Sequence, residues 1–235
     1  NRALHDASLA LRAGETVGVV GESGSGKSTF ARCLLRLIDP SGGEIFWGED
    51  EIATLPETRL RPLRHRVQVV FQDPYGSFNP RHKVARIVTE PFHLLPNPPK
   101  GKDRQNRISE ALIAVGLQPS DADKYIHAFS GGQRQRLAIA RALIRHPEIY
   151  LFDDSFSALD LTTDAQLRAA LKPLAQNAVV LVVAQRVSTI RDADQILVLE
   201  DGECVGLGTH DELIATCPTY QEIVDSQAAV NGDES

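Results

Sequence analysis

The sequence predicts an α/β fold with a mainly parallel central sheet, and three observations carry this prediction. Short apolar runs with strand character recur along the chain, and helical patterns separate several of them. One run is apolar at every position, as expected for a strand buried on both faces of a sheet. Another leads straight into a glycine-rich loop and a helical pattern. The expected strands are Thr16–Val20, Ile45–Trp47, Val67–Phe71, Ile149–Phe152, Val179–Val183 and Ile196–Leu199.

An antiparallel β side sheet is expected beside this core, because apolar residues alternate around Leu9, Leu11 and Ile45. Near the other end, the sequence Thr209-His210-Asp211-Glu212 has the pattern of a capping box that opens a terminal helix. His210 is explained by this cap and needs no other function.

An inserted α-helical subdomain is expected in the middle of the chain. Four prolines between Pro91 and Pro99 predict a loop, and a polar run follows it. Apolar residues at helical spacing then predict one helix through Ile108–Val115 and a second over Ser130–His146. The predicted division is a core at residues 1–80 and 147–215, a helical subdomain at 81–146, and a C-terminal helix and tail at 216–235.

Composition is that of an ordinary globular chain, with 235 residues, 42% of them hydrophobic. The formal net charge of −6 argues against a nucleic-acid partner. The longest strongly apolar run, Ala178–Ala184, is far shorter than the roughly 20 residues that a spanning helix needs, and no signal peptide is visible. We therefore expect a soluble, cytosolic chain with reduced thiols at Cys33, Cys204 and Cys217. The abrupt start and the lack of Met predict that it is a fragment.

The glycine-rich loop matches the phosphate-binding pattern G-x-x-x-x-G-K-[ST]. Glycines let the backbone wrap closely enough for several N–H groups to point at phosphate oxygens, and Lys27 adds a positive charge there. Ser28 is left to bind Mg²⁺. We expect a nucleoside triphosphate as the ligand, held by Gly21, Glu22, Ser23, Gly24, Ser25, Gly26, Lys27, Ser28 and Thr29.

Two further segments could serve the same ligand. The apolar strand Ile149–Phe152 leads into Asp153, which places a carboxylate at the carboxyl end of the sheet, beside the loop, where it can hold Mg²⁺. Ser130, Gly131, Gly132 and Gln133 open a helix. Their free N–H groups either bind a second anion or simply belong to a well-capped helix, and this pattern alone does not distinguish the two.

Taken in order, these motifs resemble the ATP-binding cassette (ABC) family. The phosphate loop is followed by Gln72 at a strand end, by Phe129-Ser130-Gly131-Gly132-Gln133, by Asp153, and by Ser157-Ala158-Leu159-Asp160. The resemblance covers essentially the whole chain and implies a P-loop NTPase core.

The same resemblance implies two such domains packed head to tail. ATP would lie between Lys27 of one domain and Ser130, Gly131 and Gly132 of the other, and Asp160 would communicate across the pair. Gln72 would bind Mg²⁺ and sense the transmembrane domains of a transporter. The implied location is cytoplasmic, at the inner face of the cell membrane through that partner.

The sequence departs from the family pattern at two catalytic positions. Active members usually carry Glu after the strand-ending Asp, where this chain has Asp154, and His after the next strand, where it has Gln185. The shorter side chain draws a base back by about a bond length, and a shift of about 1 Å can cost on the order of 10²-fold in rate. Both changes resemble the impaired subunit of heterodimeric exporters, so we expect slow hydrolysis at the site formed by Asp154, Gln185 and Gln72.

The two parts of the chain resemble different transporters. Residues 1–146 resemble the ATPases of dipeptide and oligopeptide importers, and residues 153–227 resemble multidrug or lipid exporters. A natural mosaic and an engineered chimera both explain this. No aromatic residue precedes Phe30, so the family's adenine-stacking aromatic is not found in the sequence.

Two other functions remain open from the sequence. The departures at Asp154 and Gln185 also suit a non-catalytic module that dimerises on ATP, as either a homodimer or a heterodimer. A soluble family relative in DNA repair or translation is a third hypothesis, and the lack of a long coiled-coil insertion and of a second cassette argues against it.

Overall fold

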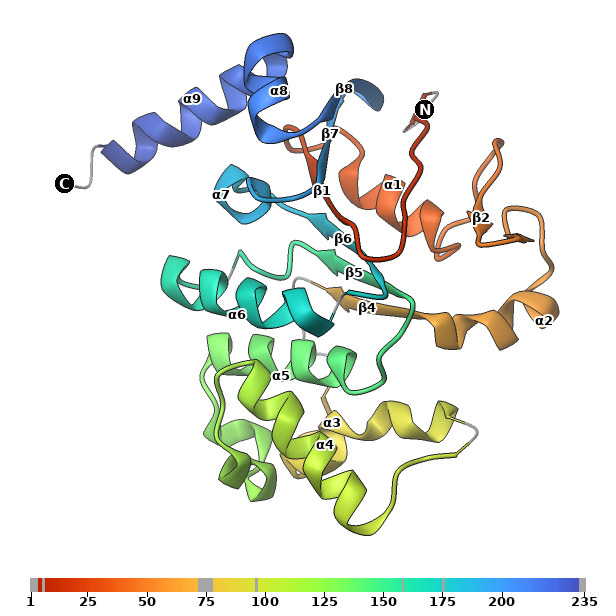
Figure 1. The fold of residues 1–235 in the computed structure, drawn as a ribbon, viewed down its shortest axis with the longest axis vertical. Helices are drawn as coiled ribbons and strands as arrows, with labels where there is room; N and C mark the ends of the chain where they lie inside the picture. The colour runs from red at the N-terminus through yellow and green to blue at the C-terminus, as the bar shows by residue number, and fades with distance from the viewer. Residues whose placement is uncertain are drawn as a thin grey trace.

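A computed structural model describes residues 4–5, 7–71, 78–95, 97–157, 159–174 and 176–232. Its centre is a six-stranded sheet in the order β4-β5-β6-β1-β7-β8 (Figure 1). All neighbouring strands are parallel except β7 and β8, which are antiparallel. The predicted α/β class is therefore confirmed. The strands are β1 Thr16–Val20, β4 Val67–Phe71, β5 Ile149–Asp153, β6 Val179–Val183, β7 Gln195–Glu200 and β8 Glu203–Gly208.

The middle strands are apolar throughout because helices cover both faces of the sheet. In β1, β5 and β6 every residue after the first is buried. Alternate strand residues belong to two different cores, so that Leu151 packs on the face of α1 (Lys27–Leu34) and Phe152 packs on the opposite face. The parallel register aligns Asp153 with Val183 and with Phe71, which brings three strand ends to one edge.

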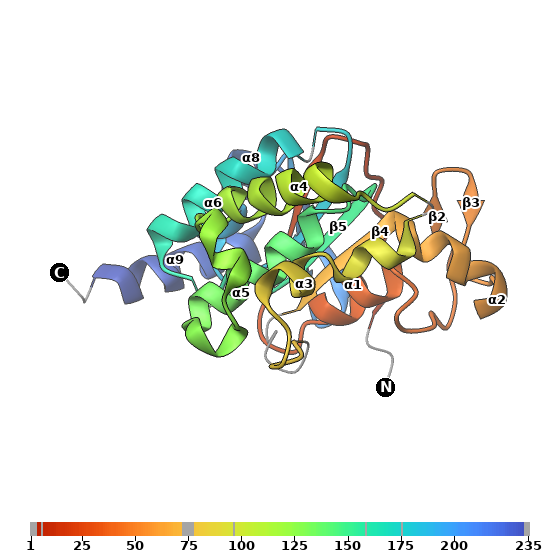
Figure 2. The same ribbon diagram turned by 90° about the horizontal axis from the view of Figure 1, so that it is seen from below.

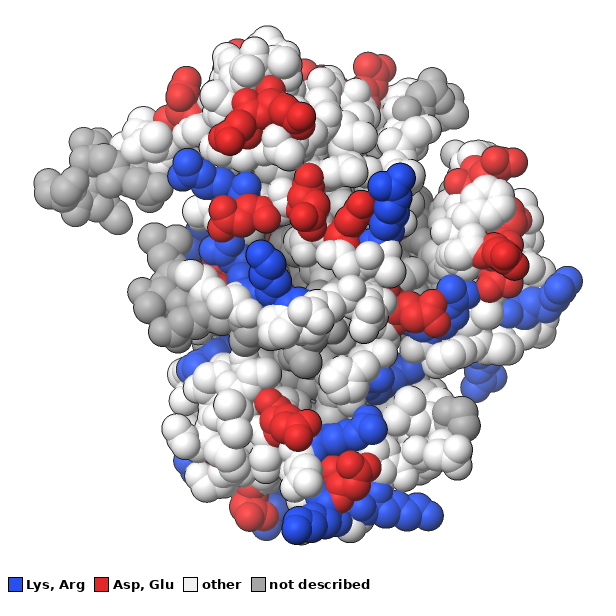
Figure 3. All heavy atoms as spheres, viewed as in Figure 1, with Lys and Arg blue, Asp and Glu red and all other residues white. Residues whose placement is uncertain are grey.

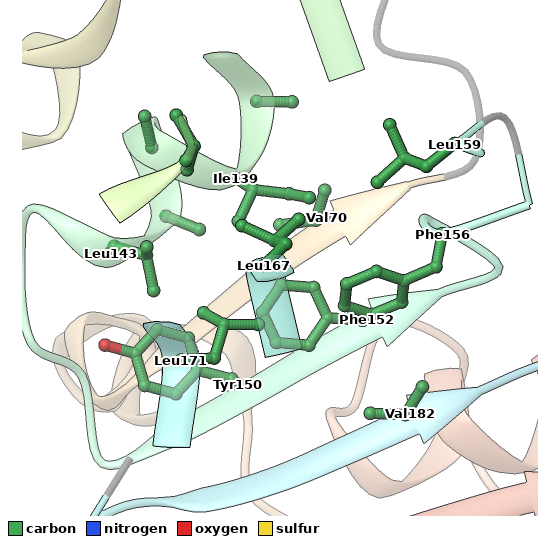
Figure 4. Close-up of a cluster of buried hydrophobic side chains, with 14 of the residues drawn as sticks. Val70, Ile139, Leu143, Tyr150, Phe152, Phe156, Leu159, Leu167, Leu171 and Val182 are labelled. Atoms are coloured by element: carbon green, nitrogen blue, oxygen red, sulfur yellow. The ribbon is translucent and has the colours of Figure 1, made fainter. Parts of the chain in front are cut away.

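The larger core lies between the sheet and the helices α5 (Gly131–Leu143) and α6 (Leu161–Leu174). Figure 4 shows Tyr150 and Phe152 of β5 among side chains of both helices. The Phe152 and Phe156 rings lie 5.2 Å apart between centroids. Phe156 thus ties the chain after β5 to the core, directly beyond the two aspartates that end the strand.

The antiparallel side sheet is smaller than predicted. In the part of the chain that the structure describes, only β2 (Phe46–Trp47) and β3 (Asp50–Glu51) pair in this sheet, and a hydrogen bond from Ile52 N–H to the Ile45 carbonyl (2.7 Å) extends the pair. Leu9 and Leu11 were expected in this sheet, but the described residues place no strand there. A strand requires a partner ladder, and these two leucines instead pack against the core on the α1 side.

A lobe of helices continues from the β4 edge of the sheet, at the bottom of Figure 1. It contains α3, α4 and α5, and the predicted helices at Ile108–Val115 and Ser130–His146 correspond to α4 and α5. The loop predicted at the prolines begins as a 3₁₀ helix, because Pro91 occupies the first turn, where its missing N–H costs nothing. The subdomain boundaries stay a prediction. Helical segments before α5 are α2 Glu57–Leu60, η1 Arg61–Arg66, α3 Val84–Val88, η3 Glu90–Leu94, α4 Gly101–Ala114, η4 Pro119–Asp123 and η5 Ile126–Ala128.

The C-terminal part adds α7 (Val187–Ile190), α8 (His210–Thr216) and α9 (Pro218–Gly232). The predicted capping box is confirmed, since Thr209 and Glu212 exchange side-chain and backbone hydrogen bonds at the start of α8. Strand β8 was not predicted. It contains Gly206, where a Cβ would lie 2.9 Å from Cys217 Sγ, so that only glycine lets the end of α8 approach so closely.

The three cysteines, expected to be buried reduced thiols, are free, but only Cys217 is buried, and Cys33 and Cys204 are partly exposed. Among the described residues no helix is both long and apolar enough to cross a membrane. Figure 2 shows α9 projecting from one side of the molecule, with the sheet beside it and the helical lobe in front.

Candidate nucleotide site

The phosphate-binding loop joins β1 to α1 in a backbone path that requires glycine. Gly24 and Gly26 have φ of 87° and 96°, a region that other residues rarely adopt. A Cβ on Gly21 would lie 2.1 Å from the Leu199 carbonyl oxygen. Gly26 caps α1 without any side-chain bond, so the first N–H groups of the helix point out of the loop. The predicted cradle is therefore built as expected for a phosphate ligand.

Lys27, the first residue of α1, folds its side chain back over this loop. Its Nζ donates to the Gly21 carbonyl oxygen at 2.8 Å and also contacts the Glu22 carbonyl and Ser25 Oγ. Burial lowers the pKa of Lys27, and the nearby Asp154 carboxylate acts in the opposite direction. The ammonium group thus lies within the loop, where a triphosphate would meet it.

Ser28 and Asp153 come together as predicted. Ser28 Oγ donates to Asp153 Oδ1 at 2.9 Å, and the Asp153 side chain is only 5% exposed. Hydroxyl and carboxylate oxygens are the ligands that Mg²⁺ prefers, and Mg²⁺ at nucleotide sites is completed by phosphate oxygens and water. That donor set fits the ion. No group of three or more His, Cys, Asp or Glu side chains in the described part of the chain could hold a metal, so the phosphates would have to complete the site.

Arg32 is a site residue that the sequence analysis missed. Its guanidinium donates to Asp153 Oδ2 at 3.1 Å and lies 5.8 Å from the centroid of the Phe71 ring. The helical spacing of four from Ser28 was the available signal, because residues i and i+4 share one helix face. Arg32 therefore holds the second oxygen of the predicted Mg²⁺ ligand.

The two catalytic candidates that depart from the family pattern contact each other. Gln185 Nε2 donates to Asp154 Oδ2 at 2.6 Å. Asp154 has a φ of 51°, unusual for a residue other than glycine, and its backbone N–H donates to the Val183 carbonyl. Burial, and secondarily the charge of Asp153, raise the pKa of Asp154. The neutral amide of Gln185 thus occupies one oxygen of the candidate base.

Gln72 was predicted to bind Mg²⁺ and to act in catalysis, and it lies outside the described residues. The residue before it, Phe71, is the last of β4 and lines the site. Its carbonyl oxygen accepts a bond from Gln135 Nε2 of α5 at 3.3 Å. Helix α5 is thereby tied to the strand end from which Gln72 follows.

A cavity of about 1040 Å³ contains the phosphate loop, Arg32, Asp153, Asp154 and Gln185. Its volume is at the upper end of the usual range for ligand sites, about 300 to 1,000 Å³. The sequence analysis did not anticipate the opposite wall, which α9 supplies through Thr219, Glu222, Ile223, Ser226 and Gln227. No sequence signal marks this contact, because polar residues along a helix are typical of any solvated face.

The second predicted anion site does not line this cavity. Ser130 caps α5, its hydroxyl accepting from Gln133 N–H (3.3 Å) while its own N–H donates to Gln133 Oε1 (2.9 Å). Gly131 and Gly132 form the first turn of this helix. Asp160 in turn accepts from Thr163 N–H at 2.9 Å at the start of α6. Within one chain, Ser130 and Asp160 are helix caps, separate from the phosphate loop.

Comparison with known proteins identifies the family. The ABC transporter family model matches residues 4–157. The chain belongs to the ABC transporter ATP-binding family. Members of this family are ATPases.

Relatives of known sequence include ATP-binding proteins of peptide transport. The oligopeptide transport protein AppF of Bacillus subtilis is 40% identical over 89% of this chain and 65% of its own length. The dipeptide transport protein DppF of Escherichia coli is 38% identical, over 99% of this chain and 71% of its own length. YejF of Escherichia coli is 42% identical over 92% of this chain, which spans 41% of that protein. The similarity to peptide-transport proteins thus extends past residue 153.

Solved structures give the same fold. A dimer of the cassette MJ0796 bound to ADP and phosphate has a TM-score of 0.80 and 31% identity, covering 88% of this chain and 90% of that chain. A bacterial Atm1-family ABC exporter with ATP bound also has a TM-score of 0.80 and 31% identity, covering 96% of this chain and 39% of that chain. Peptide-transport proteins and an exporter therefore both match most of the chain.

Proposed function

We propose that this chain is the ATP-binding and ATP-hydrolysing component of a peptide-transporting ABC system, in which two cassettes close head to tail on ATP. The observation that carries the proposal is the separation of two half-sites. Lys27, Ser28 and Asp153 line the cavity, while Ser130 lies on a separate helix N-terminus. A facing domain would bring its own Ser130, Gly131 and Gly132 to the same triphosphate, so that ATP joins the pair.

Each group has a defined task in this scheme. The loop N–H groups and Lys27 bind the β- and γ-phosphates. Ser28, Asp153 and Gln72 would hold Mg²⁺, which would supply positive charge beside the phosphates. Asp154 lies directly beyond Asp153 and accepts a proton from the attacking water. Asp160, at the cap of α6, contacts the facing domain. Release of phosphate then weakens the pair.

The same geometry supports slow hydrolysis at this chain's own site. Asp154 is one methylene shorter than the glutamate usual in the family, and Gln185 donates to its Oδ2 at 2.6 Å. An amide cannot become cationic, so Gln185 can hold Asp154 in place but cannot supply the positive charge of a protonated histidine. Both departures thus weaken the activation of water. A different cassette, with Glu and His at these two positions, would supply the faster site.

The test is phosphate release under saturating Mg-ATP by the parent, by Asp154→Glu, by Gln185→His and by the double variant. We expect the double variant to be at least about tenfold faster than the parent, because positioning the base within about 1 Å is worth that much or more. The two changes should be non-additive, since both act on one water molecule. A fast parent, or a double variant no faster than the parent, contradicts the slow-site proposal.

A non-catalytic ATP-dependent dimerisation module is the second candidate, and the contact between Gln185 and Asp154 favours it. Single-turnover hydrolysis measured beside ATP-induced dimerisation separates the two. Dimerisation with no phosphate release in either the parent or the double variant would support the module. The engineered or natural mosaic origin remains a hypothesis on the sequence motifs alone.

The partner in the membrane would be the transmembrane domains of the transporter, docked near Gln72 and the helical lobe. On the face drawn in Figure 3, basic side chains gather over the end of that lobe, where α4 carries Lys102, Arg104 and Arg107. Acidic side chains gather over α8 and over β2 and β3. The basic side chains of α4, which lie on the helix beside Asp103 and Glu110, are suited to the negatively charged cytoplasmic leaflet. We propose a peripheral location there, and recovery of the chain with membranes only when the partner is present would support it.

A further inference from the structure

The segment from Gln185 to Val187, directly after β6, holds two parts of the site at once. Gln185 donates its side-chain amide to Asp154, as described above. The guanidinium of the next residue, Arg186, donates to the carbonyl oxygens of Ser157 and Leu159, both at 3.3 Å. These carbonyls belong to the loop that leads to Asp160. The position of this short segment therefore determines the positions of both Asp154, the candidate base, and the loop expected to face the second cassette.

The side-chain amide of Gln227, in α9, forms hydrogen bonds with the backbone of that segment through both its nitrogen and its oxygen. Its Nε2 donates to the Gln185 carbonyl oxygen at 2.7 Å, and its Oε1 accepts from Val187 N–H at 2.8 Å. The two bonds lie on either side of Arg186. One side chain thus satisfies the hydrogen-bonding groups of the main chain on both sides of Arg186.

The helix that carries Gln227 is anchored independently of it. Tyr220, near the start of α9, is fully buried, and its hydroxyl lies 2.8 Å from His210 Nδ1. Thr219 Oγ1 donates to Glu200 at 3.2 Å, and Ile223 packs against the larger core. Gln227 lies about two turns beyond Tyr220. Removal of its side chain therefore frees the Gln185–Val187 segment and leaves the helix in place.

We propose that Gln227 is a positioning residue for ATP hydrolysis, which acts by fixing the Gln185–Val187 backbone against α9. The inference rests on the proposed ATPase function. Gln227 touches neither the phosphate loop nor Asp154 in any hydrogen bond of the described residues, and its effect passes through Gln185 and Arg186. In this way the C-terminal helix, which lines the same cavity, is coupled to the chemical step.

The chain offers a matched control on the same helix. Gln221 also uses its side-chain amide to hold a backbone carbonyl, that of Ile214 in α8, and among the described residues no hydrogen bond joins it to the segment after β6. Gln221→Ala and Gln227→Ala therefore remove the same group from α9. Only Gln227→Ala removes the hydrogen bonds to the backbone of Gln185 and Val187.

The first measurement is steady-state turnover of Mg-ATP by the full chain and by both variants. We expect Gln227→Ala to lower kcat by about tenfold, with KM within about twofold of the parent, because displacement of a base by a fraction of an ångström affects the chemical step and not binding. Gln221→Ala should keep the parent kcat. Equal kcat in the two variants overturns the proposal, and so does a fall in kcat that only matches a rise in KM.

The second measurement does not depend on turnover. Amide hydrogen exchange is followed in peptides covering residues 154–160 and 185–187 in the same three proteins. We expect faster exchange in both peptides for Gln227→Ala alone, since opening of this segment no longer breaks two hydrogen bonds. Parent-like exchange at residues 154–160 in Gln227→Ala overturns the proposal. A parent that fails to turn over ATP contradicts the proposed function instead, and the exchange result then decides the positioning inference by itself.

Discussion

The N-termini of α1 and α5 are both proposed to bind ATP. They differ in whether a side-chain cap already accepts hydrogen bonds from their backbone N–H groups. Helix α1 begins after Gly26, with no side-chain cap, and its first turn opens into the cavity. Helix α5 begins after Ser130, which exchanges two hydrogen bonds with Gln133 in a capping box. Lys27 folds back over the first terminus, whereas Arg134, near the start of α5, donates to the Phe129 carbonyl oxygen.

This difference assigns an order to the two sites. The terminus of α1 has free donors, a charge and neighbouring Mg²⁺ ligands, so it can bind a nucleotide within one chain. The terminus of α5 already uses part of its donor capacity in its own cap, and it gains a partner only when a bound triphosphate approaches. We therefore expect nucleotide binding to precede association, and variants at each terminus to separate the two events.

The largest effect is expected at the first terminus. Lys27→Ala removes the nearest cation to the γ-phosphate and should abolish stabilisation by Mg-ATP. For the parent, ligand at about 100 times Kd adds about 2.7 kcal/mol, which is a rise of about 5 to 10 °C in Tm for a chain of this size. Thermal denaturation with and without Mg-ATP measures it. Lys172→Ala, an exposed position on α6, is the control and should keep the full rise. An equal rise in Lys27→Ala would show that the nucleotide binds elsewhere.

The next effect is at the second terminus. Ser130→Arg places a long side chain where the facing triphosphate would approach, and it should block ATP-driven dimers while the rise in Tm from ATP binding at Lys27 remains. Light scattering with Mg-ATP measures the mass of the parent and the variant.

Because a hydrolysing dimer is short-lived, both proteins are also measured with a non-hydrolysable ATP analogue. An unchanged dimer in Ser130→Arg rules out the sandwich at this surface. If the natural partner is a different cassette, the parent itself stays monomeric and the mixture with that partner must be tested.

The smallest effect expected is a difference in pH dependence. Burial and the neighbouring Asp153 raise the pKa of Asp154 above the ordinary aspartate value of 3.8. Only the ionised carboxylate accepts a proton, so kcat should be lost as pH falls through this raised pKa, above the pH at which an exposed aspartate would titrate. The cap at Ser130 contains no titratable side chain, and association should change less over the same range. Paired profiles of kcat and of dimer mass check this, and a kcat that is flat down to about pH 4 contradicts it.

The sequence by itself determined the features that depend on short-range patterns. The β1 loop with Gly24, Gly26 and Lys27 is found where the motif predicts it, because positive φ selects glycine and a helix start requires free N–H groups. Asp153 meets Ser28 because parallel strands end at one edge of the sheet, which the apolar pattern of the strands already implied. The capping boxes at Ser130 and Thr209 are likewise local.

Only the tertiary structure decided which distant groups share the site. Leu9 and Leu11 have the alternation of a strand, yet a strand depends on a partner ladder that no local pattern encodes. The bond between Gln185 and Asp154 depends on the path of the chain after two strands. Gln227 forms hydrogen bonds with Gln185, 42 positions away, and with Val187, 40 positions away. No periodic pattern in the sequence marks these amide groups. Such contacts follow from how α9 packs beside the sheet, and packing is a property of the whole fold.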